Sequence, residues 1–199
     1  MNSSTPDKAG VKLGMWLFLY TEIMLFGGLF VLYAAYYSKY TSVFIEAGKS
    51  LDITIGALNT MILLVSSFTV ASAITAIQKK ARRSAAALVG VSMVFGVLFL
   101  VNKYFEWGHK FEAGIYPGSP DLSDAEAGKS LFFGLYYLIT GLHGIHIIIG
   151  LILLSISLYF ITTKRIHETQ FVVLENSGLY WHLVDLIWIF IFPLFYLIL

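Results

Sequence analysis

The chemistry of this sequence is concentrated in a few ionisable side chains that lie inside long apolar stretches. They are Glu22, Lys103, Glu106, His143, His146, His182 and Asp185. Imidazoles can ligate haem iron or other metal ions, and carboxyl groups can exchange protons. An ionisable group in lipid is costly, so each of these side chains is expected to face a neighbouring helix or a cavity.

The spacing of these residues predicts which of them meet. Glu22 lies about 12 Å, and Asp185 about 10 Å, from the same end of their apolar stretches, given the rise of an α-helix. His182 precedes Asp185 by three residues and shares its helix face. We therefore expect Glu22, His182 and Asp185 to lie in the same third of a helix bundle. Lys103 and Glu106 are predicted to lie near the opposite end, where both can reach water.

The histidines admit three interpretations. Ligation of one haem by His146 and His182 would make the chain a cytochrome b-type electron carrier, but their predicted heights differ by about 15 Å. A metal site built from His143 and His146 alone would lack further ligands at the same level. The interpretation that the sequence favours is hydrogen bonding between helices, or to lipid head groups and water. No metal or cofactor site is therefore expected in this chain.

Glu22 is the residue with the sharpest alternatives. Its neighbours Leu19, Ile23 and Phe26 remove water from the carboxyl group, which disfavours the charged form. The residue is then either a neutral hydrogen-bond donor to an adjacent helix or a group close to proton traffic. Asp185 is the second candidate for a buried carboxyl group of this kind.

The composition requires that lipid surrounds these residues. The 199 residues are 58% hydrophobic and 13% charged, whereas a soluble domain carries about 25% charged residues. So much apolar surface cannot be hidden in one small aqueous core. Cysteine is absent, which excludes disulfides and thiolate sites, and a net charge of +1 gives no reason to expect nucleic acid as a partner.

Apolar runs of about 20 residues or more predict an all-α integral membrane protein with five transmembrane helices in one domain, residues 1–199. The predicted spans are residues 14–37, 53–77, 85–107, 131–161 and 179–199. Small residues recur every four positions at Ser67, Ala71 and Thr75 and again at Ser92 and Gly96, which favours close helix contacts.

The basic residues predict the orientation of the spans. The N-terminus and the second and fourth connections carry Lys8, Lys12, Lys79, Lys80, Arg82, Arg83, Lys164 and Arg165. The opposite connections carry Lys39, Lys49, Lys110 and Lys129. Because basic residues favour the cytoplasmic side, we expect a cytoplasmic N-terminus and a periplasmic C-terminus. The aromatic residues Trp16, Tyr159, Tyr180 and Trp181 are predicted at the inner interface, and Tyr33, Tyr36, Tyr37, Tyr40 and Trp107 at the outer one.

Five motifs in order resemble the cytochrome c oxidase subunit III family over nearly the whole chain. They are LGMWLFLYTEIMLFGGLF around Glu22, LNTMILLVSSFTVASA from Asn59 and Thr60, NKYFEW with Glu106 and Trp107, TGLHGIH from Thr140 to His146, and GLYWHLVDLIWIFIFPLFYLI with His182, Asp185 and Trp188. Asn102 and Lys103 depart from the family's Q-x-x-E pattern. The chain is similar to the five-helix form of the family, found in bacterial quinol oxidases and several bacterial cytochrome c oxidases.

The resemblance implies a non-catalytic subunit of a proton-pumping terminal oxidase in the bacterial cytoplasmic membrane. Haem and copper would lie in partner chains, which reduce dioxygen. This subunit would pack on subunit I, accompany subunit II and a small subunit IV, bind phospholipid and support proton uptake. Glu22 would correspond to the family's carbodiimide-reactive glutamate, and Glu106, His143, His146, His182 and Trp188 would make lipid or interhelical contacts.

Several alternatives stay open at this point. The electron donor to the complex is cytochrome c or a quinol. A third possibility, which the same motifs do not exclude, is a related accessory protein of nitric oxide reductase. From other classes, a small transporter would need a span broken by Gly or Pro in its middle, and a haem b anchor would need the histidine ligation described above.

Overall fold

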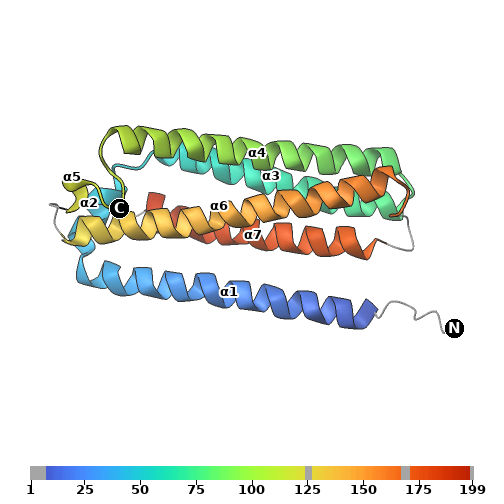
Figure 1. Cartoon of the computed structure of the whole chain (residues 1–199), viewed down its shortest axis with the longest axis horizontal. Helices are drawn as coiled ribbons and strands as arrows, with labels where there is room; N and C mark the ends of the chain where they lie inside the picture. The colour runs from blue at the N-terminus through green and yellow to red at the C-terminus, as the bar shows by residue number, and fades with distance from the viewer. Residues whose placement is uncertain (1–7, 124–126, 167–170, 198–199) are drawn as a thin grey trace.

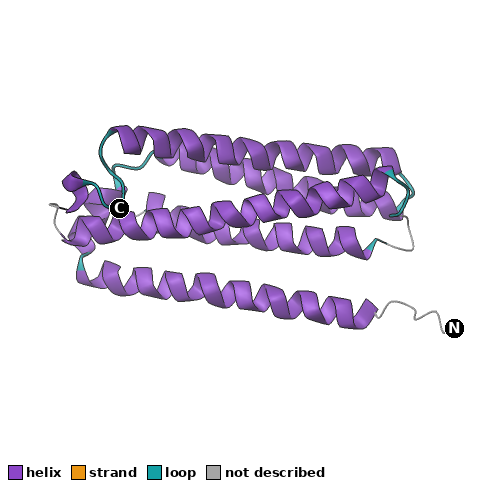
Figure 2. Cartoon of the chain, in the orientation of Figure 1, coloured by secondary structure: helices purple, strands orange, loops and turns teal. Residues whose placement is uncertain are grey.

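The computed structural model describes residues 8–123, 127–166 and 171–197, and within them every regular element is a helix (Figure 2). The helices are α1 (Lys8–Lys39), α2 (Thr41–Gly48), α3 (Ile53–Gln78), α4 (Arg82–Glu112), α5 (Pro120–Ser123), α6 (Ala127–Thr162) and α7 (Val172–Tyr196). In this described part of the chain, α1, α3, α4, α6 and α7 are long and apolar enough to cross a membrane. The prediction of an all-helical chain with five apolar spans is confirmed.

Several helices extend past the predicted spans. α4 begins three residues before and ends five residues after residues 85–107, and α7 begins at Val172 rather than at residue 179. The prediction followed the apolar run alone, whereas a helix continues through polar turns as long as its backbone hydrogen bonds are made. The predicted first connection also contains a helix of its own, α2, which lies beside the start of α6.

Four of the long helices form a close bundle, and α1 lies along its edge (Figure 1). α3 packs against α4 and α7, and α6 packs against the same two helices. In the most apolar stretch of α1 only 11% of the residues are buried, compared with 56% in α7. α1 therefore depends on few side chains for its attachment to α6 and α7.

Large aromatic side chains fill the core, and glycines make room for them. Trp181 is fully buried, and its indole N–H donates to Ser66 Oγ at 2.8 Å. An added Cβ would lie 2.7 Å from the Trp181 ring at Gly96 and 2.6 Å from it at Gly150, so side chains there would clash. The small residue at position 96 thus serves a close contact, as its spacing predicts.

Some predicted interfacial aromatic residues lie in this core instead. Tyr33, Tyr180 and Trp181 are buried, whereas Trp16 and Tyr159 are exposed. Tyr33 donates to the Leu194 carbonyl oxygen at 2.7 Å, and Tyr180 donates to the His146 carbonyl oxygen at 3.3 Å. Their polar groups find partners inside the protein, so these three residues contribute to the core, and their level relative to the membrane interface stays a prediction.

Candidate functional site

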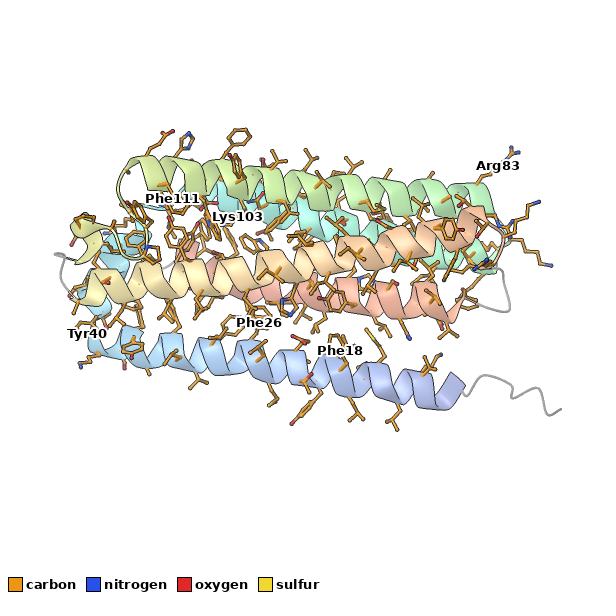
Figure 3. The ribbon with its side chains drawn as sticks, viewed as in Figure 1. Phe18, Phe26, Tyr40, Arg83, Lys103 and Phe111 are labelled. Atoms are coloured by element: carbon orange, nitrogen blue, oxygen red, sulfur yellow. The ribbon has the colours of Figure 1, made fainter. Side chains whose placement is uncertain are left out.

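The largest polar cluster lies between α4, α6 and α7 and contains Lys103, Glu106, Tyr136 and Tyr196. The Lys103 ammonium contacts Glu106 Oε2 at 3.0 Å and the two tyrosine hydroxyl groups at 3.1 Å and 2.8 Å. The Tyr136 and Tyr196 hydroxyls both donate to Glu106 Oε1, at 2.6 Å and 2.5 Å. Figure 3 shows Lys103 on the side of α4 that faces the bundle. We call these four side chains the core cluster.

The core cluster is buried, which corrects the prediction that Lys103 and Glu106 can reach water. Lys103 is 7% exposed and Glu106 is 5% exposed. Both side chains are covered because the side of α4 that carries them packs against α6 and α7. At Lys103 and Glu106 the polar side of α4 therefore points into the bundle. A buried ion pair is tolerated when further hydrogen bonds satisfy its remaining polar atoms, and the two tyrosines supply those bonds.

A second pair joins α1 to α6. Glu22 Oε2 lies 2.8 Å from His146 Nε2, and the opposite ring nitrogen, Nδ1, lies 2.8 Å from the Leu142 carbonyl oxygen. Phe26 packs edge-on against the imidazole at 5.2 Å between ring centroids, and it lies on the side of α1 that faces the bundle (Figure 3). The two side chains are largely buried, with 14% of Glu22 and 9% of His146 exposed.

The hydrogen bonds fix where one proton lies in this pair. A carbonyl oxygen only accepts, so His146 Nδ1 carries the hydrogen that it donates to Leu142. Nε2 then either accepts a hydrogen from a protonated Glu22 or donates one to the Glu22 carboxylate. In both cases the bond between Glu22 and His146 holds a single proton and the pair as a whole is neutral. The pair can therefore shift one proton by the length of one hydrogen bond without changing its net charge.

Glu22 pairs with His146, whereas the prediction grouped it with His182 and Asp185. α1 begins at Lys8 rather than at residue 14, so Glu22 is about 21 Å along the helix. His146 is about 24 Å from the other end of its helix, the C-terminal end of α6. These two levels match, because the N-terminal end of α1 and the C-terminal end of α6 lie at the same end of the bundle (Figure 1).

His182 and Asp185 lie together on α7 without Glu22. His182 Nδ1 shares a hydrogen bond with Ser67 Oγ on α3 at 2.5 Å. Asp185 is 3% exposed, and neither of its oxygens has a hydrogen-bond partner among the residues that the structure describes. An ionised carboxylate without a partner in that position would be costly.

His143 and Trp188 form an aromatic contact in the centre of the bundle. His143 is fully buried, lies 5.2 Å from the Trp188 ring and 5.4 Å from the Phe99 ring, and its nitrogens have no hydrogen-bond partner within the described part of the chain. Trp188 Nε1 donates to Thr60 Oγ1 on α3 at 3.0 Å. His143 and His146 thus serve different contacts although they are one helical turn apart.

The histidines considered as metal or haem ligands lie in separate contacts. Over residues 8–123, 127–166 and 171–197, no three His, Cys, Asp or Glu side chains are grouped closely enough to hold a metal ion. His146 and His182, the pair considered for haem, are each engaged in hydrogen bonds with other side chains.

Comparison with known proteins gives the family. The sequence profile described as cytochrome c oxidase subunit III matches residues 2–198. The chain is 30% identical to a probable cytochrome c oxidase subunit 3 of Rickettsia bellii, over 96% of this chain and 70% of that protein. It is 30% identical to cytochrome c oxidase subunit 3 of Synechocystis, over 93% and 74% of the two chains. It is also 29% identical to cytochrome bo(3) ubiquinol oxidase subunit 3 of Buchnera aphidicola, over 98% and 92%.

The chain belongs to the cytochrome c oxidase subunit III family. It is a multi-pass membrane protein of the respiratory chain, a subunit of a haem-copper oxidase complex that contains other subunits. The predicted family resemblance is confirmed, and the motifs that carry it can be placed in the structure.

The subunit III motifs lie where the helices contact one another. Asn59, at the start of the second motif, is fully buried, and its Oδ1 accepts a hydrogen bond from Asn102 Nδ2 on α4 at 2.8 Å. Asn102 and Lys103 are the two residues that depart from the family's pattern, and each forms a polar contact with another helix in this chain. The departures therefore belong to the polar interior rather than to the surface.

Tyr136 and Tyr196 are the members of the core cluster that sequence reasoning missed. They lie on α6 and α7, at separations of 33 and 93 residues from Lys103, so no local spacing connects them to it. The available signal was their type, because a tyrosine inside an apolar span needs a partner for its hydroxyl group.

Proposed function

We propose that this chain is the non-catalytic, cofactor-free subunit III of an aerobic respiratory cytochrome c oxidase, and that it stabilises subunit I and supports proton uptake during dioxygen reduction. Family membership indicates that the chain is part of an oxidase complex. The observation that carries the finer role is the pairing of its buried ionisable groups: Lys103 with Glu106, and Glu22 with His146. The bond of Glu22 to His146 and the bonds that Tyr136 and Tyr196 donate to Glu106 hold helices together, and groups engaged in this way are not available to ligate a redox centre.

The proposal includes the position of the chain in the membrane and its partners. The N-terminus lies in the cytoplasm and the C-terminus in the periplasm of a bacterial inner membrane, because the basic residues gather at one end of the bundle. Figure 3 places Arg83 at the end opposite to Tyr40. Subunit I is the main contact, with subunit II, a small subunit IV and phospholipid around it, and residues 1–199 act as one domain.

The proposed site consists of the buried polar residues. Glu22 is the proton-related carboxyl group, and its Oε2 lies 2.8 Å from His146 Nε2, within hydrogen-bond distance. Asp185 is a second such group, since it is buried without a described hydrogen-bond partner. The interhelical contacts are made by Glu106, His143, His146, His182 and Trp188.

One observation supports a second candidate, subunit III of a quinol oxidase. The chain spans 92% of the ubiquinol oxidase subunit of Buchnera aphidicola but 70–74% of the two cytochrome c oxidase subunits. The similar length agrees with the five-helix form of the quinol branch. Oxidation of cytochrome c, compared with oxidation of a quinol, by the purified complex decides between the two donors.

Purification in mild detergent tests the proposed function. We expect the tagged chain to co-purify with a chain that carries haem and copper, and the haem absorption of the complex to persist after the chain is removed. The isolated chain should have no Soret band. A stoichiometric haem signal in the isolated chain would instead support a haem b anchor, and transport of a solute by liposomes holding only this chain would support a transporter.

A further inference from the structure

Two tyrosine hydroxyl groups and one carboxylate meet inside the core cluster. The hydroxyl oxygens of Tyr136 and Tyr196 lie 2.6 Å and 2.5 Å from the same atom, Glu106 Oε1, and 3.3 Å from each other. Tyr136 is fully buried, and Tyr196 is 1% exposed. A general base must lie within about 2.6–3.2 Å of the group whose proton it accepts. Glu106 is therefore placed to take the phenol proton of either ring.

The cation of the core cluster determines how these rings can lose an electron. The Lys103 ammonium lies 5.0 Å from the centre of the Tyr136 ring and 5.4 Å from that of the Tyr196 ring. A ring that lost an electron and kept its proton would place a second positive charge beside this ammonium, which is costly in a medium of low dielectric constant. A ring that gave its proton to Glu106 at the same time would stay neutral. The cluster therefore favours loss of an electron together with a proton, which converts a phenol into a tyrosyl radical.

A row of aromatic rings connects the two tyrosines to the surface of the bundle. Tyr136 packs edge-on against Tyr137 at 5.3 Å between ring centroids, and Tyr137 packs edge-on against Trp107 at 5.1 Å. Trp107 is half-buried and lines a pocket of about 240 Å³ between α4 and α6. The pocket is also lined by Tyr104, which is 76% exposed. A membrane-soluble molecule in this pocket can therefore reach the Trp107 ring.

The rings of this row differ in whether a base accepts their proton. Tyr137 donates to the Ile115 carbonyl oxygen at 2.7 Å, and a peptide carbonyl group is a much weaker base than a carboxylate. Trp107 Nε1 has no hydrogen-bond partner among the described residues. Within this row the radical can therefore rest as a neutral species on Tyr136 or Tyr196, whereas Tyr137 and Trp107 pass an electron without losing a proton.

We propose that the core cluster and this row form a one-electron relay, in which a one-electron oxidant formed during dioxygen reduction oxidises Tyr136 or Tyr196. One electron leaves the phenol for the oxidant, the phenol proton moves to Glu106 Oε1, and a tyrosyl radical and a neutral carboxyl group remain. An electron then passes from Trp107 through Tyr137 to the radical, and the proton returns from Glu106 to the phenol oxygen. A hydroquinone of the membrane gives one electron to the oxidised Trp107, becomes a semiquinone and releases a proton.

The relay carries oxidising equivalents out of the protein interior. After the first step the cluster has one net positive charge, because the neutral Glu106 no longer balances Lys103, and an uncompensated buried charge is costly. The radical is therefore short-lived in the core and moves to Trp107. No proton leaves the cluster, so the relay is compatible with its structural role. The inference rests on the proposed function for its oxidant, and it adds a redox activity of the chain's own side chains.

Spin trapping in the purified complex tests this proposal. The complex reacts with hydrogen peroxide in the presence of a nitrone spin trap, and peptide mass spectrometry locates the adducts on this subunit at successive times. The double variant Tyr136→Phe with Tyr196→Phe keeps both rings and removes both phenol groups, and Trp107→Phe removes the outer end of the row. Tyr33→Phe is the matched control, because Tyr33 is 2% exposed and donates at 2.7 Å to a backbone carbonyl oxygen instead of a carboxylate.

The relay predicts a distinct result for each sample. The wild type forms adducts at Trp107, and the double variant loses them although Trp107 itself is unchanged. Each single tyrosine variant keeps part of the signal, because the other phenol still contacts Glu106. Trp107→Phe moves the adducts inward to the two tyrosines, and Tyr33→Phe changes nothing. Adduct formation at Trp107 is slower in deuterium oxide, because each passage of an electron moves a proton between a phenol and Glu106.

Three outcomes would overturn the proposal. Adducts at Trp107 that persist in the double variant, or adducts confined to exposed tyrosines such as Tyr104 and Tyr159, would mean direct attack by peroxide from outside. Equal rates in water and deuterium oxide would exclude Glu106 as the proton acceptor. The wild-type map and the single variants decide the question even where the double variant does not assemble.

Failure of the relay is distinguishable from failure of the proposed function. The haem spectrum and the companion chains of the same preparation are measured separately from the adducts. A complex that contains a haem-copper chain and forms no such adducts on this subunit contradicts the relay alone, whereas a preparation without a haem-copper chain contradicts the proposed function.

Discussion

The two buried acid–base pairs among the described residues differ in the number of helices that they join and in how completely they are satisfied. The core cluster connects α4, α6 and α7, and Lys103 and Glu106 contact each other and two tyrosines. The pair of Glu22 and His146 connects only α1 to α6 and is completed by a backbone carbonyl group.

The difference teaches which pair is structural and which can respond to its surroundings. In the core cluster each atom has a fixed partner, so a proton or an ion that leaves would cost several hydrogen bonds at once. In the pair of Glu22 and His146, which we call the edge pair, one proton can lie on either side of a single bond, and one of its two helices, α1, has few buried residues. We therefore assign the core cluster to stability and the edge pair to any proton-linked role of the subunit.

Removal of one charge from the core cluster should have the largest effect. Lys103→Met leaves Glu106 buried without its cation, and loss of one partner of a buried pair costs about 3–5 kcal/mol. We expect much less of this chain in the purified oxidase and a lower midpoint for its thermal loss from the complex. Both are measured by quantifying the subunit in the complex after heating.

The double variant Lys103→Met with Glu106→Leu is the matched control. Replacement of a whole buried pair by apolar side chains is often close to neutral, so the double variant should be more stable than the single one. Equal losses in both variants would mean that packing at position 103, and not the uncompensated charge, determines the stability.

Changes in the edge pair should have an intermediate effect on stability and a clear effect on reactivity. Breaking the hydrogen bond costs about 1–2 kcal/mol in a membrane protein, so His146→Phe should loosen α1 while the complex still assembles. It should also increase carbodiimide labelling of Glu22, because the carboxyl group loses its partner. Glu22→Gln should abolish this labelling, preserve the haem spectrum and shorten the time over which the oxidase stays active during turnover.

The same measurements can contradict the assignment of the edge pair. Labelling that persists in Glu22→Gln would place the reactive carboxyl group elsewhere, with Asp185 as the next candidate because it is buried without a described hydrogen-bond partner. If His146→Phe and Glu22→Gln both kept the turnover lifetime of the wild type, the edge pair would serve only as a contact between helices.

The sequence predicts some of these contacts and not others for a physical reason. Apolar length identifies the spans, and a separation of three residues identifies neighbours on one helix, such as Lys103 and Glu106. The partner across the bundle depends on where each helix begins and how it is rotated. Six extra residues at the start of α1 and seven at the start of α7 shift Glu22 and Asp185 by about the same distance, so their heights still agree, and it is the rotation of α1 that brings Glu22 to His146.

Burial was predicted less well than position along the chain. Tyr180 and Trp181 follow the start of an apolar run, which is where interfacial aromatic residues are found, but α7 begins eight residues before Tyr180 and both rings face the core. The inward face of a helix that is apolar all round has no periodic signal, because every face contains similar residues. Polar residues on such a helix, for example Asn59 and Asn102, are then the better indicators of the inward face.

The hydrogen bond between His182 and Ser67 should give the smallest effect and separates packing from charge. Ser67→Ala removes one neutral contact between α3 and α7, for which membrane proteins lose about 0.6 kcal/mol on average. We expect a small decrease in thermal stability and no change in carbodiimide labelling, since Glu22 pairs with another histidine. Thr75→Ala is the control, because the Thr75 hydroxyl is exposed and donates within its own helix to the Ala71 carbonyl oxygen. If Ser67→Ala lowered the thermal stability as much as Lys103→Met does, the region of His182 and Asp185 on α7 would carry a charge that Ser67 stabilises. The distinction between a structural core cluster and a responsive edge pair would then have to include this region as a third site.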